Sequence, residues 1–223
     1  MLWATFPWFV RSTVADDASS DGEVTADLGP GRVALIVGPS GAGKDAILAE
    51  VRRRLGDSAE FTFPRRVVTR RPGSAEEHDG VSQSEFAAEL AAGHYALHWQ
   101  AHGLSYGIPI AIDAAVRAGG CVVFNASRSV AASARRRYRH AAVVLIDAPA
   151  ATRAARLAHR GREDGKEQAA RLTRASDFSA ADAELVIDNA GALTAAVETL
   201  AAWLMRWQCG SQAPNADVER GCL

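Results

Sequence analysis

The residues best suited to chemistry form one short stretch in the first quarter of the chain. It reads Gly38-Pro39-Ser40-Gly41-Ala42-Gly43-Lys44-Asp45 and matches the pattern G-x-x-x-x-G-K. Three glycines let the backbone curl so that successive N–H groups point at phosphate oxygens, and Lys44 then reaches the β- and γ-phosphates of a nucleotide. We therefore predict that residues 38–45 hold the phosphates of a nucleotide.

The sequence on either side favours a phosphate-binding loop over a chance Gly/Pro/Ser turn. The preceding run, residues 33–37, is short and apolar and is closed by glycine, which is typical of a buried parallel strand. The following residues place apolar side chains at helical spacing before a stop at Gly56. These side chains are Ile47, Leu48, Val51 and Leu55. Strand, loop and helix in this order are the context that the motif requires.

Asp45 occupies the position at which a serine or threonine usually holds Mg²⁺. A carboxylate beside polyphosphate is repelled by about 4 kcal/mol at about 4 Å with an effective dielectric constant of about 20, and a cation between them reverses the sign. The strand ending at Phe124 is followed by Asn125 and Ser127 instead of an acidic metal ligand. We hypothesise that Asp45 holds Mg²⁺, directly or through water. The alternative is that it only complements the N-terminus of its helix.

Arginines in two further regions supply the positive charge that phosphoryl transfer needs. Arg70 and Arg71 lie in a segment, residues 65–107, in which an acceptor could bind. The same segment contributes His98, His102 and Tyr106, whose side chains suit hydroxyls or phosphates. A second group flanks the charged turn 161–166, which could close over the site as a lid. This group comprises Arg156, Arg160, Arg162 and Arg171. Each arginine alone is typical of a surface, whereas their arrangement around a phosphate loop favours catalysis.

Strands and helices alternate along the rest of the chain. Apolar runs at 33–37, 121–124, 142–146 and 185–187 are separated by helical patterns, which predicts right-handed βαβ units, a parallel central sheet and a three-layer α/β fold. The strand-like segments 61–69, 95–102 and 104–106 and a capping box at Ser82–Glu85 belong to the insert. Asn125 and Ser127 follow a strand at its carboxyl end, where ligands collect in such sheets.

We expect one domain over residues 32–205, between a tail over 1–31 and a polar tail over 206–223. Within the domain we expect an insert at about 65–107 and a lid at about 156–171.

Composition limits the class of protein. A chain of 223 residues with a net charge of −1 suits one α/β domain and gives no general attraction to nucleic acid or to an anionic membrane. The basic run 135–139 is best interpreted as a solvated helix end.

The three cysteines at 121, 209 and 222 include no C-x-x-C, which disfavours disulfides and zinc and suggests the cytoplasm. The apolar residues 1–10 lack a basic start and end at Arg11, so we expect no secretory signal and no membrane span. The sequence does not indicate an oligomeric state.

Several motifs resemble the guanylate kinase-like family and, within it, the branch of ribose 1,5-bisphosphate phosphokinases. The similarity covers about residues 32–204 and includes the Gly-Lys-Asp ending of the phosphate loop. The other matching stretches are Thr69-Arg70-Arg71-Pro72, Leu97-His98-Trp99-Gln100-Ala101-His102-Gly103-Leu104-Ser105-Tyr106-Gly107, Asn125-Ala126-Ser127-Arg128, Arg160-Gly161-Arg162-Glu163 and Ala170-Arg171-Leu172.

The resemblance implies a P-loop kinase with an acceptor-binding insert and an arginine-bearing lid. It implies that ATP, with Mg²⁺, phosphorylates the 1-phosphate of ribose 1,5-bisphosphate, in phosphonate catabolism. It also implies that Arg70 binds an acceptor phosphate and that Asn189 lies near adenine. The residues expected to stabilise the transferring group are Arg156, Arg160 and Arg171.

The chain departs from true guanylate kinases in the acceptor segment. It has His98 where those enzymes carry a guanine-binding glutamate, and the tyrosine that follows their Gly-x-x-Tyr stretch has no counterpart after Gly80. Their second phosphate-binding arginine falls on Gly73, which leaves Arg71 as a substitute. Two other functions stay open at this point: a nucleoside monophosphate kinase with altered base preference, and a non-catalytic interaction module. The intact loop glycines and Lys44 count against the module.

Overall fold

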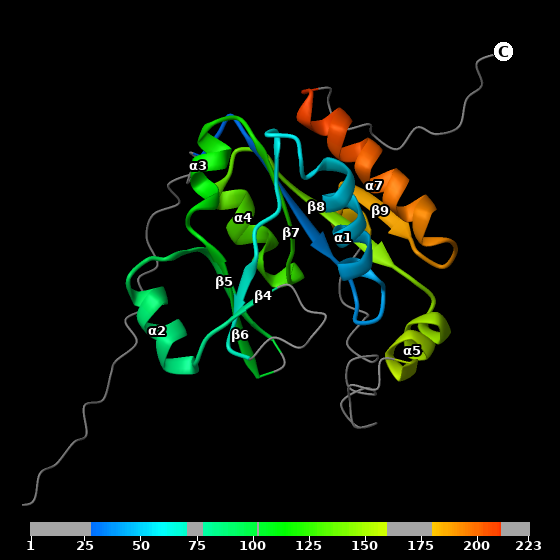
Figure 1. The fold of residues 1–223 in the computed structure, drawn as a ribbon, viewed down its shortest axis with the longest axis horizontal. Coiled ribbons are helices and arrows are strands. Elements are labelled where there is room, and N and C mark those ends of the chain that lie inside the picture. The colour runs from blue at the N-terminus through cyan, green and yellow to red at the C-terminus, as the bar shows by residue number, and fades with distance from the viewer. Residues whose placement is uncertain (1–27, 71–77, 102, 160–179, 211–223) are drawn as a thin grey trace, which may run out of the picture.

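The computed structural model describes residues 28–70, 78–101, 103–159 and 180–210. Its centre is a sheet of five strands in the order β2-β7-β1-β8-β9, in which all neighbours are parallel (Figure 1). These strands are β1 (Arg32–Val37), β2 (Phe61–Thr62), β7 (Cys121–Asn125), β8 (Ala141–Asp147) and β9 (Leu185–Asp188). The parallel central sheet predicted from the sequence is therefore confirmed.

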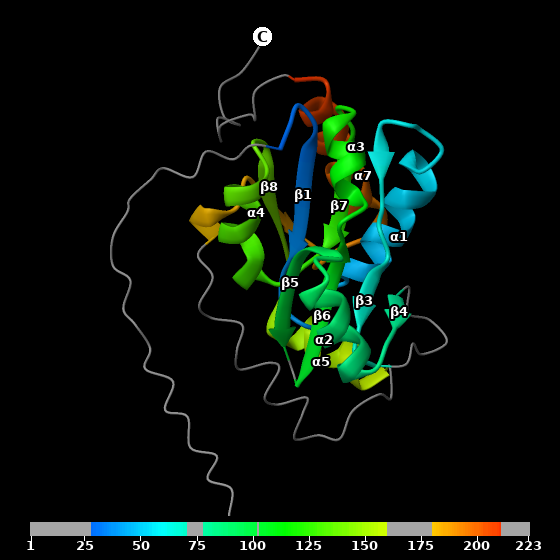
Figure 2. The ribbon, with the colours of Figure 1, turned by 90° about the vertical axis from the view of Figure 1, so that its left-hand side faces the viewer.

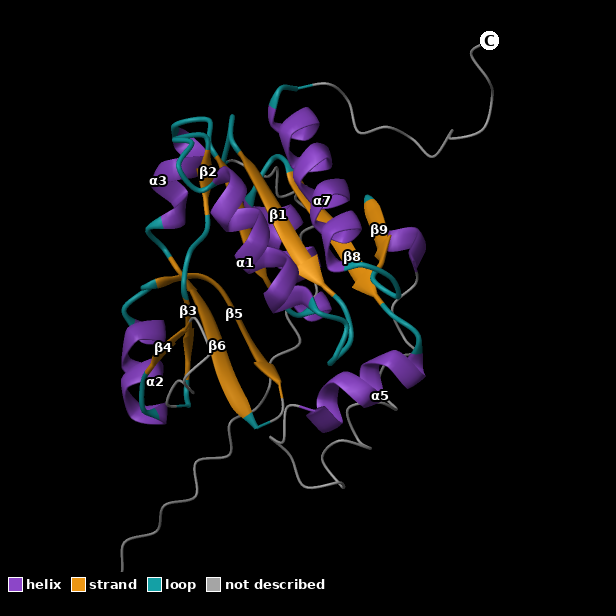
Figure 3. Ribbon diagram, turned by 45° about the vertical axis from the view of Figure 1, so that its right-hand side comes forward, coloured by secondary structure: helices purple, strands orange, loops and turns teal. Residues whose placement is uncertain are grey.

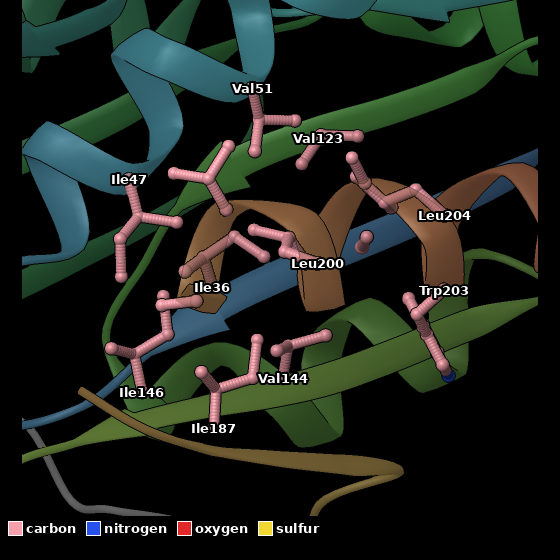
Figure 4. Packing of buried hydrophobic residues seen from close by; sticks show 14 of the residues in the cluster. Ile36, Ile47, Val51, Val123, Val144, Ile146, Ile187, Leu200, Trp203 and Leu204 are labelled. Atoms are coloured by element: carbon pink, nitrogen blue, oxygen red, sulfur yellow. The ribbon is translucent and has the colours of Figure 1, made fainter. Parts of the chain in front are cut away.

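Helices cover both faces of this sheet, and Figure 2 shows α1 and α4 on opposite sides of it. The helices are α1 (Lys44–Leu55), α3 (Ile112–Arg117), α4 (Ala131–Arg137) and α7 (Leu193–Gln208). Because side chains alternate along a strand, β1 supplies both layers of the core. Ile36 packs with Ile47 of α1 and Leu200 of α7 (Figure 4). On the other face, Leu35 belongs to a cluster that contains Val116 of α3.

A second, smaller sheet follows the strand order β4-β3-β6-β5. Its strands are β3 (Arg66–Val68), β4 (His78–Gly80), β5 (Tyr95–Ala101) and β6 (Leu104–Pro109), with α2 (Gln83–Ala91) between β4 and β5. The predicted capping box begins α2: Ser82 accepts from the Glu85 backbone N–H, and Glu85 accepts from the Ser82 backbone N–H. That second bond lowers the pKa of Glu85. This sheet occupies the segment predicted as the insert.

The strand expected over 61–69 is divided between the two sheets. Its first part is β2, at the edge of the central sheet beside β7, and its last part is β3, in the second sheet. Pro64 lies between them, and a proline cannot donate to a β ladder. A single strand was therefore the wrong prediction here, because the chain changes sheets at this point.

The second sheet and α5 (Ala150–His159) both lie beyond the carboxyl ends of the central strands (Figure 3). β1 lies between β7 and β8 in the sheet, and the chain runs from β1 through α1 to the β7 side before it returns to β8. This is the reversal point of an open α/β sheet, where ligands bind. The loop 38–43 follows β1 at this point.

The described chain begins with ordered contacts at Leu28. Leu28 forms a bridge with Tyr138, its backbone N–H donates to the carbonyl of Arg137 at 3.2 Å, and the Gly31 N–H donates to the carbonyl of Val116 at 2.9 Å. The domain therefore includes residues 28–31, which were expected to belong to the tail. Residues 1–27 and 211–223 lie outside the described residues. No helix in the described part of the chain is long and apolar enough to span a membrane.

Candidate active site

The loop 38–43 has the backbone geometry of a phosphate cradle. Gly38, Gly41 and Gly43 have φ angles of 145°, 80° and 92°, in the region that favours glycine. A Cβ at Gly38 would lie 2.0 Å from the carbonyl oxygen of Ile146, so the loop leaves β1 in close contact with β8. The first helical residue after the loop is Lys44, so the N-terminus of α1, which is the positive end of the helix dipole, lies directly after the loop.

Lys44 folds back over this loop. Its Nζ donates to the carbonyl oxygens of Gly38 at 2.8 Å and Pro39 at 2.9 Å. These bonds hold the ammonium group beside the loop, where it would meet the β- and γ-phosphates of a bound nucleotide. The binding of phosphate by Lys44 stays a prediction from the motif.

Asp45 lies where the central domain meets the second sheet. Its Oδ1 accepts a 2.7 Å hydrogen bond from Nδ2 of Asn125, at the end of β7, and Nη2 of Arg66 lies 3.8 Å from the same oxygen. The register pairs Asn125 with Ile36, so the parallel strands bring Asn125 beside the loop. Asn125 is buried, whereas the Asp45 side chain is 65% exposed.

The Asp45 carboxylate suits a magnesium ion held together with nucleotide phosphates. Among the described residues, no hydrogen bond or ion pair reaches its Oδ2, and Mg²⁺ commonly takes only one or two protein carboxylates and keeps several waters. No group of three or more His, Cys, Asp or Glu side chains in the described ranges could hold a metal alone. The residues present therefore fit a metal that arrives with the nucleotide.

Asn189 and Arg156 support the loop from the side of β9 and α5. Asn189 is buried, and its Nδ2 donates to the carbonyl of Ala42 at 2.8 Å. Arg156 donates from Nη2 to the Asn189 carbonyl at 2.9 Å and from Nη1 to the Ala42 carbonyl at 3.4 Å. Oδ1 of Asn189 is buried and has no hydrogen-bond partner among the residues that the structure describes. Asn189 and Arg156 thus both contact the backbone of the loop at Ala42, while the predicted roles of Asn189 near adenine and of Arg156 at the transferring group stay predictions.

Arg153 is a second arginine at the loop, which the sequence reasoning missed. It is only 6% exposed, and its Nε donates to the carbonyl of Ala148 at 3.0 Å. Its Nη1 is buried and has no partner within the described ranges. A Cβ at Gly41 would lie 2.8 Å from the Arg153 carbonyl oxygen, so the first turn of α5 packs directly on the loop. The signal was available: Arg153 and Arg156 are three residues apart and share one face of a helix.

The second sheet divides the predicted acceptor residues between its two faces. Tyr106 is opposite Trp99 in the β5–β6 register and stacks on it, with ring centroids 5.2 Å apart and planes 4° apart. Both rings belong to or pack on the core shared with the central domain. His98 is exposed and precedes Trp99, so its side chain points to the opposite face. The sequence therefore placed His98 and Tyr106 in one group, whereas the sheet separates them.

The other predicted acceptor residues lie at the edges of this region. Arg70 is exposed two residues after the end of β3, and its carbonyl oxygen lies 3.1 Å from Nε2 of the buried His78. Ser127 caps a short 3₁₀ helix (Arg128–Val130), because its Oγ accepts from the N–H of Ser129 at 3.3 Å and from the Ser129 hydroxyl at 2.9 Å. Four predicted site residues, Arg71, His102, Arg160 and Arg171, lie outside the described residues.

The phosphate loop at the sheet reversal, with a second sheet beyond the strand ends, defines a P-loop kinase fold. A crystal structure of guanylate kinase from Anaplasma phagocytophilum superposes with a TM-score of 0.61 at 16% identity, covering 86% of this chain and 92% of that one. No family model matches the sequence.

The particular family follows from closer relatives. The chain is 48% identical over 153 residues to ribose 1,5-bisphosphate phosphokinase PhnN from Acidiphilium cryptum (strain JF-5). The aligned region covers 69% of this chain and 82% of the relative. It is 44% identical over 175 residues to the protein of the same name from Methylobacterium radiotolerans, and this alignment covers 78% of this chain and 98% of the relative. The chain belongs to the family of ribose 1,5-bisphosphate phosphokinases PhnN. The resemblance drawn from its motifs is confirmed.

Proposed function

We propose that this chain transfers the γ-phosphoryl group of ATP to the 1-phosphate of ribose 1,5-bisphosphate, in the cytoplasm and within phosphonate catabolism. The product is 5-phospho-α-D-ribose 1-diphosphate (PRPP), and ADP leaves. The observation that carries this proposal is an intact phosphate loop with Lys44 in place, in a chain 44% identical to a PhnN relative over 98% of that relative's length. The expected partner is this small phosphorylated sugar, and we expect neither a nucleic acid nor a membrane.

The reaction forms one P–O bond and breaks another. An oxygen of the acceptor's 1-phosphate attacks the γ-phosphorus, and the bond from that phosphorus to the bridging oxygen of the β-phosphate breaks. Little covalent assistance is needed, because catalysis consists of alignment and of stabilising charge on the equatorial oxygens. The loop amides and Lys44 supply fixed donors for the β- and γ-phosphates. Mg²⁺ bound with ATP would neutralise further charge, and Asp45 is the side chain proposed to hold it.

The arginines have two proposed tasks. Arg156 already contacts the loop backbone at Ala42, and its guanidinium is proposed to stabilise the transferring group. Arg160 and Arg171 are proposed to join it. On the acceptor side, Arg70 and Arg71 are proposed to bind phosphate, with His102 and Tyr106 contributing to the sugar site, whereas His98 lies on the other face of the sheet and is not assigned to it. Guanidinium groups suit this work because they bind phosphate oxygens in pairs.

The test is an assay of ADP release against a panel of acceptors. Ribose 1,5-bisphosphate, ribose 5-phosphate, ribose 1-phosphate, GMP and AMP are each offered with ATP and Mg²⁺, and ³¹P NMR identifies the product. We expect ADP release with the bisphosphate and the coupled resonances of a diphosphate ester. Fast turnover of GMP or AMP without turnover of the bisphosphate would instead identify a nucleotide kinase. Absence of ADP release with every acceptor would favour a non-catalytic module.

A further inference from the structure

Arg66 is a partly buried cation at the junction between the phosphate loop and the second sheet. It is the first residue of β3, and its Nη2 lies 3.8 Å from Oδ1 of Asp45, the residue after Lys44. A separation of 3.8 Å allows electrostatic attraction but is too long for a hydrogen bond. The Arg66 side chain is only 24% exposed. The guanidinium group therefore occupies the space between the element that binds the donor and the sheet predicted to bind the acceptor.

Arg66 has unused hydrogen-bonding capacity. An arginine carries five N–H donors, and none of those of Arg66 makes a hydrogen bond with the part of the chain that the structure describes. The neighbouring Arg65 differs, since its Nε donates to Asp79 at 2.8 Å and its Nη2 donates to the carbonyl of His78 at 3.0 Å. Arg65 thus ties β3 to β4. Within the described residues, the one charged partner of Arg66 is the distant carboxylate of Asp45, which is itself well exposed to water.

The face of the sheet identifies what Arg66 can reach. Side chains alternate along β3, so Arg66 and Val68 share a face. Val68 is opposite Tyr106 in the register, and residues opposite each other project from the same face. Arg66 and Tyr106 therefore lie on the face that meets the central domain, whereas His98 lies on the other. Arg66 therefore places a guanidinium group, which can bind phosphate oxygens bidentately, on the face that meets the central domain.

We propose that Arg66 binds the acceptor's 1-phosphate, the group that receives the phosphoryl from ATP, and so determines acceptor specificity. This inference rests on the proposed function. Arg70 lies four residues further along, in the bend after β3, and is left to bind the 5-phosphate. In the absence of acceptor, the attraction between Arg66 and Asp45 keeps the guanidinium beside the loop.

Two substitutions at Arg66 and one at Arg65 test the assignment. In Arg66→Gln we expect the KM for ribose 1,5-bisphosphate to rise about a hundredfold while the KM for ATP changes less than about twofold. Arg66→Lys keeps the charge but loses bidentate binding, so we expect a rise of about tenfold. Arg65→Gln is the matched control, because it removes an equal charge from the adjacent residue. We expect both of its KM values to stay within about twofold of the wild type.

Calorimetric binding of monophosphates to the ATP-free protein gives a readout that needs no turnover. We expect Arg66→Gln to weaken binding of ribose 1-phosphate about tenfold or more and to leave binding of ribose 5-phosphate unchanged. An unchanged acceptor KM in Arg66→Gln, or an equal loss for both monophosphates, would overturn the assignment. Failure of the wild type to phosphorylate the bisphosphate would overturn the proposed function itself. Thermal melting of each variant shows whether a loss reflects unfolding.

Discussion

Nδ2 of Asn125 donates a 2.7 Å hydrogen bond to Oδ1 of Asp45, joining the end of β7 to the first turn of α1. In a P-loop enzyme these two positions belong to one metal site: the residue after the loop lysine and a residue at the end of a neighbouring strand. Here the strand supplies the neutral amide and the loop supplies the carboxylate. The contact supports the hypothesis that Asp45 is the acidic ligand of the metal. Its carboxylate lies beside the end of β7, where the acidic side chain of other P-loop enzymes is found, although Asp45 itself belongs to α1.

Replacing Asp45 with asparagine should raise the Mg²⁺ concentration needed for half-maximal rate by about tenfold or more. A neutral amide binds a hard cation less well than a carboxylate, and the oxygen of the introduced amide could still accept the hydrogen bond from Asn125. The measurement is initial rate against Mg²⁺ at fixed ATP, with calorimetric binding of ATP in the presence and absence of Mg²⁺ beside it. Glu50→Gln on the same helix is the control, because Glu50 pairs with Arg53. Equal titrations for Asp45→Asn and wild type would show that Asp45 serves only the helix end.

Lys44→Ala should lower kcat by about a hundredfold to a thousandfold, because it removes a fixed cation from the charge that shifts in the transition state. The protein should stay folded. The two carbonyls that Lys44 contacts belong to partly exposed residues, which water can then reach. Single-turnover rates and melting temperatures measure the two effects. Arg53→Ala, a cation on the exposed side of the same helix, should leave kcat unchanged. Near-normal turnover in Lys44→Ala would refute the assignment of the phosphate loop.

Gly43→Ala and Gly93→Ala form a matched pair that separates backbone strain from damage to the loop. Both residues have positive φ, 92° and 75°, so each alanine costs about 1–2 kcal/mol of folding free energy. A Cβ at Gly43 would also lie 2.4 Å from Nδ2 of Asn189, whereas no atom lies within 4 Å of one at Gly93. We therefore expect both to lose stability in urea but only Gly43→Ala to lose kcat/KM, by about tenfold or more. Equal activities would show that the contact between Gly43 and Asn189 has no functional role.

The parallel sheet and the phosphate loop were predictable because both depend on local patterns. Short apolar runs determine the strands, and the glycine spacing determines the loop. What the sequence could not show is how the second sheet docks. The contact between Arg66 and Asp45 joins β3 to the first turn of α1 and leaves no periodic signal in the sequence. The separation of His98 from Tyr106 depends on a register that only the folded hairpin fixes. The burial of Arg153 was missed for a related reason: a charged residue in a helix is usually exposed, and packing on Gly41 overrides that tendency.

The last prediction concerns discrimination between a sugar bisphosphate and a nucleotide. An enzyme that selects guanine must place an acceptor against the two N–H donors of the base, because a site left with unpaired polar groups rejects the ligand. In this chain the position of the guanine-binding glutamate is His98, which the sheet turns away from the central domain. The side chain that faces the phosphate loop is Arg66, which can only donate hydrogen bonds.

Two phosphates on one small acceptor would use the arginines more fully than the single phosphate of GMP. We therefore expect kcat/KM for ribose 1,5-bisphosphate to exceed that for GMP by at least about a hundredfold, roughly 2.7 kcal/mol of transition-state preference. Competition between the two acceptors in one reaction, with both products quantified, measures this ratio directly. Inorganic phosphate at matched ionic strength controls for nonspecific anion binding. Comparable efficiency with GMP would show that base recognition survives without the glutamate, and the acceptor would then have to be assigned anew.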